Sequence, residues 1–419
     1  MFKVSKWLLF LILFLNVIIA FAEENLCSGF VKRNGNQLYL NGNPYRAVGV
    51  NIPNLHQSFM GTWRHDQQIY GTSSAAKNAM IQAVESAARN GFAFIRFFAS
   101  PGYPSDIDKL YMKDRKAYWA GMDELFMLCR KNNIRVIPSL GCIIGAAGFS
   151  DYFEEPRRAI LDRCSHSRRA LDEYVREFVT RYKDSSVVLM WELQNEAMLS
   201  ADVPRKFQEE KMFEASVVKR WEKSGNIKKR YYGGPVNDAI SYDEIVKLYQ
   251  EQCAFIQSLD PNHPVTSGDA ETRPECTSRR ETFPDFKFRA DTPEERIANN
   301  IRSQPLPLDV FSYHFYGKCG ETGILDDKVS QSMRQIIRAS LADGRPVFIG
   351  EIGELGGPKK SPEQKWLIQW IDEAEKEKVS LIALWVWNFP WQPNLTMDEF
   401  NVAPLIHRCR EFNRKYAGK

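Results

Sequence analysis

The chain has no large excess of charge of one sign, few histidines and no paired-cysteine motif. It holds 56 Lys and Arg against 52 Asp and Glu, a net charge of +4, which gives no electrostatic basis for binding nucleic acid. Its 8 cysteines include no C-x-x-C pair and its 6 histidines form no cluster, so we expect no metal. No G-x-G-x-x-G follows the first expected strand, which argues against a doubly wound dinucleotide-binding sheet.

Only one long apolar run occurs, and it lies at the start of the chain. Residues 1–22 place Lys3 and Lys6 before an apolar stretch and end in the small-x-small sequence Ala20-Phe21-Ala22. This pattern predicts a cleaved secretory signal peptide. An uncleaved anchor is the alternative, but the run is shorter than the ~20 residues of a membrane span. We therefore expect a secreted, or in a bacterium periplasmic, protein with no membrane contact after cleavage. All the cysteines follow this segment, and export permits disulfides whose pairing the sequence does not define.

Residues 23–419 show one repeating pattern and no linker, which predicts a single domain. Short β-branched and aromatic runs alternate with amphipathic helical stretches such as 74–91, 168–182, 243–259 and 361–377. Eight such units predict an α/β fold, a single (β/α)8 TIM barrel, in preference to an open sheet. A β-hairpin with Asn-Gly-Asn turns, within residues 30–45, is expected to cap the bottom of the barrel. The expected strands are 45–51, 92–99, 134–141, 187–196, 264–270, 309–316, 346–353 and 381–389.

Polar and aromatic side chains gather where these strands end. Active sites of barrels of this type lie at the carboxyl ends of the strands. A packed barrel needs apolar and small residues inside, so charged residues at the same level of separate strands indicate a functional site. The strand ends carry Asn51, Arg96, Asn195, Glu196, Asp269, His314, Tyr316, Glu351 and Trp387.

The fourth run, VVLMWELQNE, contains two glutamates on one side of the strand. At about 3.3 Å per residue, Glu192 would lie roughly 13 Å deeper than Glu196. A carboxylate at that depth needs a partner, so we expect Glu192 to be structural and to pair with an arginine inside the barrel. Glu196, at the rim, is the catalytic candidate.

Glu351, at the end of the seventh strand, is the natural counterpart of Glu196. Two carboxyl groups about 5–5.5 Å apart are typical of a retaining glycosidase. Without Glu196, Glu351 could be explained simply as a negative charge at the N-terminus of the helix that follows. Arg96 could keep a carboxylate ionised, and His314 and Tyr316 could orient it. Trp387 offers a stacking surface for a sugar, whereas Trp385 is expected in the core; His56, Trp63 and Tyr232 are further candidates for sugar contacts.

At these residues the chain resembles glycoside hydrolase family 5, within the clan of (β/α)8 retaining glycosidases. The matching motifs are NGNPYRAVGVN, FIRFF, WELQNE, SYHFYG, VFIGEIG and LWVWNF, in order over about residues 30–415. The resemblance implies Glu196 as acid/base and Glu351 as nucleophile. It further implies that Asn195 binds the sugar 2-hydroxyl, that His314, Tyr316 and Arg96 support Glu351, and that Trp387 stacks on the sugar in the −1 subsite.

The substrate implied by the resemblance is a β-1,4-linked polysaccharide or oligosaccharide, without any cofactor. Many cellulases of the family have a histidine after the third strand, where this chain reads SLGCII, and the WEL-x-NE form is more similar to the β-mannanase branch. Mannan or glucomannan is therefore the leading substrate, with an endo-β-1,4-glucanase as the alternative. A catalytically silent sugar-binding barrel is disfavoured because both glutamates are present. A Schiff-base aldolase is disfavoured because none of the strand ends named above carries a lysine.

Overall fold

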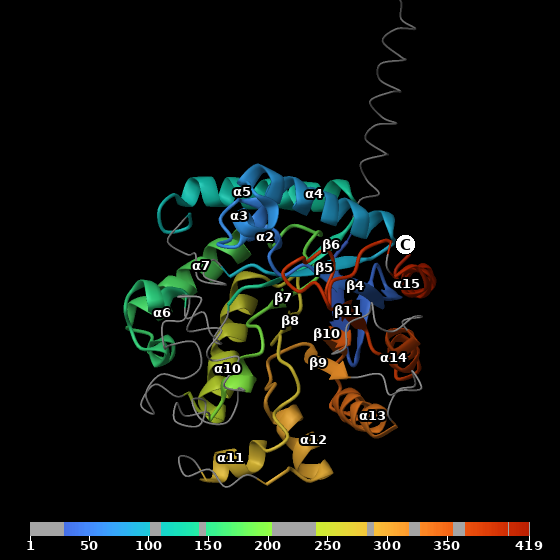
Figure 1. Cartoon of the computed structure of the whole chain (residues 1–419). Helices are drawn as coiled ribbons and strands as arrows, with labels where there is room; N and C mark the ends of the chain where they lie inside the picture. Colours follow the sequence, from blue (N-terminus) through green and yellow to red (C-terminus); the bar gives the residue numbers. More distant parts are fainter. Residues whose placement is uncertain are drawn as a thin grey trace, which may run out of the picture.

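Eight parallel strands form the centre of the molecule, in the order β8-β7-β6-β5-β4-β11-β10-β9 (Figure 1). A bridge between Thr266 and Val310 links the two outer strands, so the barrel is nearly closed. The strands are β4 (Ala47–Asn51), β5 (Phe94–Phe98), β6 (Arg135–Ser139), β7 (Trp191–Glu192), β8 (Val265–Thr266), β9 (Phe311–Gly317), β10 (Val347–Glu354) and β11 (Leu381–Leu384). The predicted (β/α)8 barrel is confirmed, with a strand beginning inside each of the eight expected runs; β9 and β10 each continue one residue past the expected end.

The computed structural model describes residues 29–100, 110–141, 148–202, 240–282, 289–317, 327–354, 365–400 and 402–418. The expected signal peptide, Cys27, Cys142, Cys319 and Tyr232 lie outside these residues. Within them, no helix combines the length and apolarity required to cross a membrane.

Helices surround the barrel on its outer side, as Figure 1 shows for α4 and α5 above the strands and for α13 and α14 beside β9 and β10. They are α2 (Leu55–Phe59), α3 (Asp66–Tyr70), α4 (Ser73–Arg89), α5 (Arg115–Lys131), α6 (Gly148–Tyr152), α7 (His166–Tyr182), α10 (Tyr242–Leu259), α11 (Cys276–Thr282), α12 (Pro293–Arg302), α13 (Asp327–Ala342), α14 (Lys365–Lys376) and α15 (Ala403–Tyr416), with 3-10 turns η1 (Arg157–Leu161) and η2 (Ala197–Ser200).

The ends of the long helices follow from local sequence. Thr72 caps α4 by accepting a hydrogen bond from the Ala75 N–H, and Gly91, at φ 79°, follows its last turn. Ser241 and Glu244 form a capping box at the start of α10, because each side chain bonds the backbone N–H of the other. This cap fixes where α10 begins, and α10 packs behind β8.

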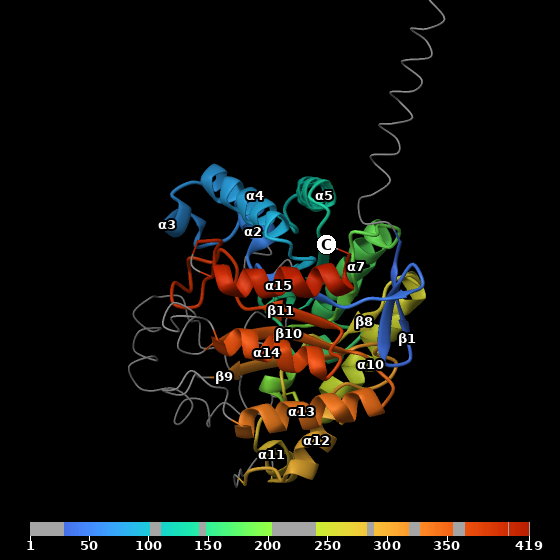
Figure 2. The same cartoon turned by 90° about the vertical axis from the view of Figure 1, so that its right-hand side faces the viewer.

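The predicted N-terminal hairpin forms a three-stranded antiparallel sheet of β1 (Val31–Asn34), β2 (Gln37–Leu40) and β3 (Asn43–Pro44). Figure 2 shows β1 at one end of the barrel. Its Val31 and Leu38 pack in one buried cluster with residues at the starts of strands, including Phe94 and Phe348. The hairpin therefore closes the end where the strands begin, as predicted, and leaves the opposite end for the site.

Alternation along the strands decides which side chains enter the barrel. In β5, Ile95 and Phe97 belong to the cluster between barrel and helices, so Arg96 between them points inward. In β9, Phe311, Tyr313 and Phe315 pack outward in the same way. His314 and Tyr316 therefore project into the barrel.

Candidate active site

Arg96 lies at the centre of the site and is completely buried. Its Nε and Nη2 donate to the two carboxylate oxygens of Glu192 at 2.7 and 2.8 Å, a bidentate pair. Its Nη1 donates to Glu351 Oε1 at 2.8 Å, and its remaining bonds reach Asn51 Oδ1 and Asn195 Oδ1 at 3.0 and 2.7 Å. Burial alone would lower the pKa of the Arg96 guanidinium, but the charges of Glu192 and Glu351 outweigh it and raise this pKa.

The prediction that Glu192 pairs with an arginine inside the barrel is confirmed. The Arg96 guanidinium also contacts Glu351, so it connects the two glutamates. Glu192 therefore supports the side chain that binds Glu351. Glu192 thus fixes the position of Arg96 without being exposed to a substrate.

Glu351 lies in β10 opposite His314 of β9, just after an irregularity in the strand register at Gly350. The Tyr316 hydroxyl donates to Glu351 Oε2, while Arg96 occupies Oε1. Burial raises the pKa of Glu351, and the cations and hydrogen bonds around it, from Arg96 and Tyr316 among others, oppose that rise. Both oxygens of this carboxyl group are therefore held in fixed directions.

Glu196 lies in the turn after β7, and its carboxyl group extends into the same site. Its backbone has a left-handed conformation, φ 52°, and its N–H donates to the Gly268 carbonyl at 3.0 Å. The side chain is 26% exposed, yet desolvation by the surrounding barrel raises the pKa of its carboxyl. The charges of Arg96 and Arg273 partly counter this effect.

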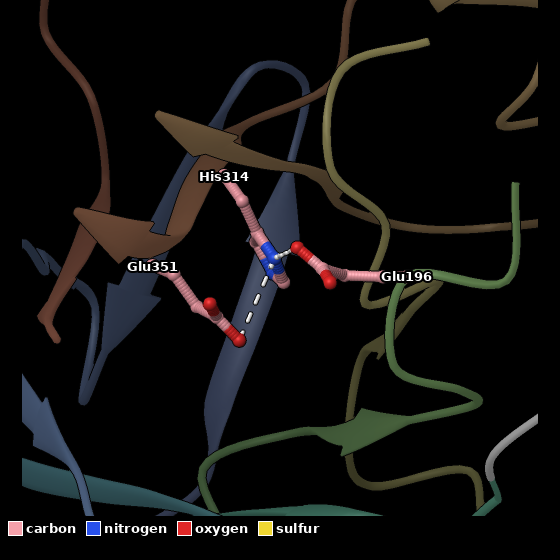
Figure 3. Close-up of side chains that lie close together, drawn as sticks. All are labelled: Glu196, His314 and Glu351. Carbon is pink, nitrogen blue, oxygen red and sulfur yellow. Dashed lines mark hydrogen bonds and ion pairs between the residues drawn. The ribbon is translucent and has the colours of Figure 1, made fainter. Parts of the chain in front are cut away.

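His314 lies between the two glutamates (Figure 3). Its Nδ1 is 2.9 Å from Glu196 Oε1 and 3.5 Å from Glu351 Oε1. His314 was expected to support Glu351, but its contact with Glu351 is the longer of the two. The hydrogen bond of His314 is with Glu196. Burial lowers the pKa of His314 to about 4, so the imidazole is neutral at neutral pH, and its Nδ1 shares one hydrogen bond with the Glu196 carboxyl group.

The two carboxyl groups are close to one another. One oxygen from each glutamate and one nitrogen of His314 all lie within 4.8 Å of one another. Among the described residues these three are the one group of His, Cys, Asp and Glu side chains close enough together to hold a cation. The Arg96 guanidinium, 2.8 Å from Glu351, already supplies a positive charge there and opposes a second one.

An aromatic cavity of about 200 Å³ adjoins this centre. Tyr316 packs against the aromatic cluster that forms its floor, and Phe98 lies under Arg96, with 5.4 Å from Arg96 Cζ to its ring centre. The His65 and Trp391 rings stack at its rim, 3.8 Å between centres, and Trp391 is 43% exposed. The lining consists of Pro53, Asn54, Gln57, Trp63, Arg64, His65, Phe98, Trp385, Phe389, Trp391 and Gln392.

The assignment of the two tryptophans after β11 is reversed by the structure. Trp387 is fully buried outside the barrel, where its Nε1 donates to Ser86 of α4 at 3.1 Å, so the stacking role predicted for it is wrong. Trp385 lines the cavity, and its Nε1 donates to Gln392 Oε1 at 2.8 Å. Because β11 ends at Leu384, the inward–outward alternation of a strand no longer applies at either position.

Of the weaker candidates for sugar contacts, Trp63 lines the cavity. His56 is buried against Phe97 and Tyr118, away from that lining. The sequence analysis missed Phe98, Phe389 and Trp391. Phe98 and Phe389 fall within apolar expected strands, and Trp391 follows the last of these strands. The remaining predicted residues, Arg96, Asn195, Glu196, His314, Tyr316 and Glu351, do come together.

Comparisons with known proteins agree with this geometry. Residues 46–390 match the family model described as cellulase, glycosyl hydrolase family 5. No curated protein sequence matches the chain. Its fold is similar to that of an endo-1,4-β-mannanase from Rhizomucor miehei, with a TM-score of 0.62 and 16% identity over 92% of this chain and 100% of that one.

Two further solved structures are similar in fold at comparable identity. An endo-β-1,4-mannanase from Thermotoga petrophila gives a TM-score of 0.56 at 15% identity, over 90% of this chain and 78% of that one. A β-mannanase from the blue mussel Mytilus edulis gives 0.54 at 13% identity, over 92% and 96%. The family match covers most of the chain, and the strand-end glutamates lie where the barrel places its chemistry. The chain therefore belongs to glycosyl hydrolase family 5, the cellulase family, and is an O-glycosyl hydrolase.

Proposed function

We propose that this enzyme hydrolyses β-1,4-mannan or glucomannan with retention of configuration, through a covalent intermediate on Glu351. The observation that carries the proposal is the short separation of the two carboxyl groups, whose nearest described atoms lie within 4.8 Å. Inverting enzymes keep their carboxyls about 6.5–9.5 Å apart to admit a water molecule, whereas retaining enzymes need about 5–5.5 Å.

The surroundings of the two glutamates favour different roles. Glu351 accepts hydrogen bonds on both oxygens, from a cationic guanidinium and from a phenol, and these stabilise its ionised form. Glu196 shares its hydrogen bond with a neutral imidazole and has no direct contact with a cation of the kind that Glu351 has with Arg96, and desolvation raises its pKa. Glu351 is therefore suited to attack the anomeric carbon, and Glu196 to hold the proton that the leaving oxygen takes.

The two half-reactions use the same two carboxyl groups, with the direction of proton transfer at Glu196 reversed. Glu351 displaces the leaving sugar to form a glycosyl ester, and Glu196 protonates the departing oxygen. Ester formation removes the negative charge of Glu351, which makes loss of the Glu196 proton easier. Ionised Glu196 then takes a proton from water, and this water cleaves the ester.

The cavity supports binding of a sugar chain beside the catalytic pair. Its flat aromatic groups, Trp63, Trp385 and Trp391, offer apolar faces for pyranose rings, and Gln57 and Gln392 offer hydrogen-bonding groups. Mannan is proposed over cellulose because the chain reads SLGCII after the third strand, where many cellulases carry a histidine. Three solved structures of similar fold are those of mannanases.

The runner-up is an endo-β-1,4-glucanase, in keeping with the family description. Incubation with mannan, glucomannan, carboxymethyl-cellulose, mixed-linkage glucan and xylan, with counting of new reducing ends, separates the two. Release from mannan or glucomannan by the wild type and not by Glu351→Gln supports the proposal. Release from cellulose alone selects the glucanase. Binding without release by the folded protein selects a silent carbohydrate-binding barrel.

We also propose that the enzyme is exported, on the basis of the leader-like residues 1–22. Expression of the full chain followed by N-terminal sequencing of the protein in the medium tests this. A mature protein that begins at Glu23 supports export, and retention of the whole chain inside the cell contradicts it.

A further inference from the structure

Glu351 points into the barrel, although the alternation along β10 would turn it outward. Val347 and Ile349 belong to the cluster between barrel and helices, and Phe348 belongs to the inner cluster at the hairpin end of the barrel. Strict alternation would place Glu351 on the outer side together with Ile349. Its carboxyl group instead contacts Arg96 inside the barrel. The direction of this side chain therefore needs a local cause.

The cause is one extra residue in β10. Along β9, the residues that pair with Ile349 and Glu351 are consecutive, so two steps along β10 match a single step of its neighbour. Along β11, the three steps from Ile349 to Ile352 match two. Both neighbouring strands therefore indicate a one-residue β-bulge at Gly350. The bulge reverses the alternation, so Glu351 faces inward and Ile352 faces outward.

The side chain of Asn51 contacts this bulge from across the barrel interior. Asn51 ends β4, which β11 separates from β10, and it is 1% exposed. Its Nδ2 donates to the Gly350 carbonyl at 2.9 Å and lies 3.3 Å from the Leu384 carbonyl oxygen. A bulge interrupts the hydrogen bonds of a sheet, and the Asn51 amide supplies a donor to the backbone at that point.

The other end of the same amide contacts the guanidinium that binds Glu351. Asn51 Oδ1 accepts from Arg96 Nη1 at 3.0 Å, and the same nitrogen donates to Glu351 Oε1 at 2.8 Å. The two ends of the amide cannot be exchanged, because a guanidinium only donates and a carbonyl only accepts. Asn51 thus holds both the backbone just before Glu351 and the cation in contact with its carboxylate.

Gly350 leaves the space that His314 occupies. A Cβ at Gly350 would lie 2.8 Å from His314 Nε2 and 3.2 Å from Ser312 Oγ. The His314 side chain is fully buried, so it has little room to move away. Because His314 Nδ1 is hydrogen-bonded to Glu196 at 2.9 Å, the bulge affects both catalytic glutamates.

We infer that Asn51 is a positioning residue for the nucleophile: it stabilises the bulge at Gly350 and so directs Glu351 into the site. This inference rests on the proposed role of Glu351. Misplacement of a reacting group by about 1 Å can cost roughly 100-fold in rate. Loss of the Asn51 side chain should therefore lower kcat about 100-fold and leave KM little changed, the signature of an interaction needed only in the transition state.

The Asn51→Ala variant gives a test that needs no substrate. Its crystal structure should show β10 changed at Gly350. The distance from Arg96 Nη1 to Glu351 Oε1, 2.8 Å in the wild type, should exceed the hydrogen-bond limit of about 3.2 Å. An intact bulge with this distance unchanged overturns the inference.

Asn51→Asp removes the donor alone, and it serves where loss of the whole side chain prevents folding. Beside Arg96 the new carboxyl group stays ionised, so it keeps an acceptor for Nη1 but offers only an oxygen to the Gly350 carbonyl. The bulge should change as in Asn51→Ala. Retention of the wild-type bulge in this variant contradicts the role given to the amide.

Asn413→Ala is the matched control for activity. Asn413 of α15 is also fully buried, and its Nδ2 donates to the carbonyls of Val48 and Gly91, each at 2.8 Å, on the outer side of the barrel. Its loss should lower the urea midpoint to a similar extent as Asn51→Ala but leave kcat unchanged. Equal losses of kcat in the two variants overturn the inference, because general destabilisation would then explain both.

Gly350→Ala tests the bulge from the backbone side. The added methyl group should displace the His314 ring, lengthen its 2.9 Å contact with Glu196 and lower kcat. Wild-type kcat in this variant contradicts the importance of the bulge. Absence of hydrolysis by the wild type on every glycan would instead overturn the proposed function, and the Arg96–Glu351 distance in Asn51→Ala would still decide whether Asn51 positions Glu351.

Discussion

Glu192→Gln tests the buried charge network on which the site depends. Both side chains of the Glu192–Arg96 pair are 0% exposed, and the pair is bidentate at 2.7 and 2.8 Å. Glutamine can accept one of these two bonds, but its amide group meets a guanidinium N–H with another donor. Removing one partner of a buried ion pair lowers the free energy of unfolding by about 3–5 kcal/mol. Because the glutamine keeps one of the two hydrogen bonds, we expect a loss of about 3 kcal/mol.

The same substitution alters the nucleophile. With the Glu192 charge gone, the positive charge of Arg96 acts mainly on Glu351, so the pKa of Glu351 falls. Activity requires ionised Glu351, and the acid limb of kcat/KM should therefore move to lower pH, although the protein is less stable.

Urea unfolding and a pH–rate profile measure the two effects on one preparation. Glu124→Gln is the matched control, because Glu124 pairs with Lys77 at the surface, with 51% and 38% of the side chains exposed. An exposed pair contributes about 0–1 kcal/mol, so this control should scarcely alter unfolding. Equal stability losses in the two variants, with the acid limb unmoved, would refute the role given to the Glu192–Arg96 pair.

Further predictions concern single side chains. Tyr316→Phe removes a hydrogen bond to Glu351 and should raise the pKa of Glu351, which moves the acid limb of kcat/KM to higher pH. Trp391→Ala should raise KM for long oligosaccharides about tenfold with kcat unchanged, the signature of about 1.4 kcal/mol of uniform binding. Trp387→Ala should leave KM alone but cost about 3–5 kcal/mol in urea unfolding. Burial lowers the pKa of His56 to about 3, so between pH 6.5 and 3 the unfolded chain binds a proton at this residue that the folded chain does not. The free energy of unfolding of the wild type should therefore fall as the pH drops through this range. In His56→Gln the fall should be smaller.

Regular strands made much of the site predictable from sequence. Arg96, His314 and Tyr316 lie within β5 and β9, where alternation holds, and their inward direction follows directly from their neighbours. The pairing of Glu192 with an arginine followed from the cost of burying an isolated carboxylate. The eightfold repeat of strand and helix was sufficient to predict the barrel.

The errors lie where the strands stop. β11 ends at Leu384, so counting alternate residues to Trp387 gave the wrong tryptophan. β7 ends at Glu192, and the left-handed backbone at Glu196 brings that carboxyl beside His314 in a way that no strand rule describes. The cavity was missed in part because its rim, including Trp391, comes from loops, whose conformation depends on contacts distant in sequence.

The anomeric configuration of the first product tests the central claim most directly. A β-linked oligosaccharide of whichever glycan the enzyme cleaves is hydrolysed in an NMR tube, and the anomeric proton signals are recorded before mutarotation. Carboxyl groups this close predict that the β-anomer appears first and the α-anomer only later. Initial release of the α-anomer would contradict the double displacement and the role of Glu351 as nucleophile.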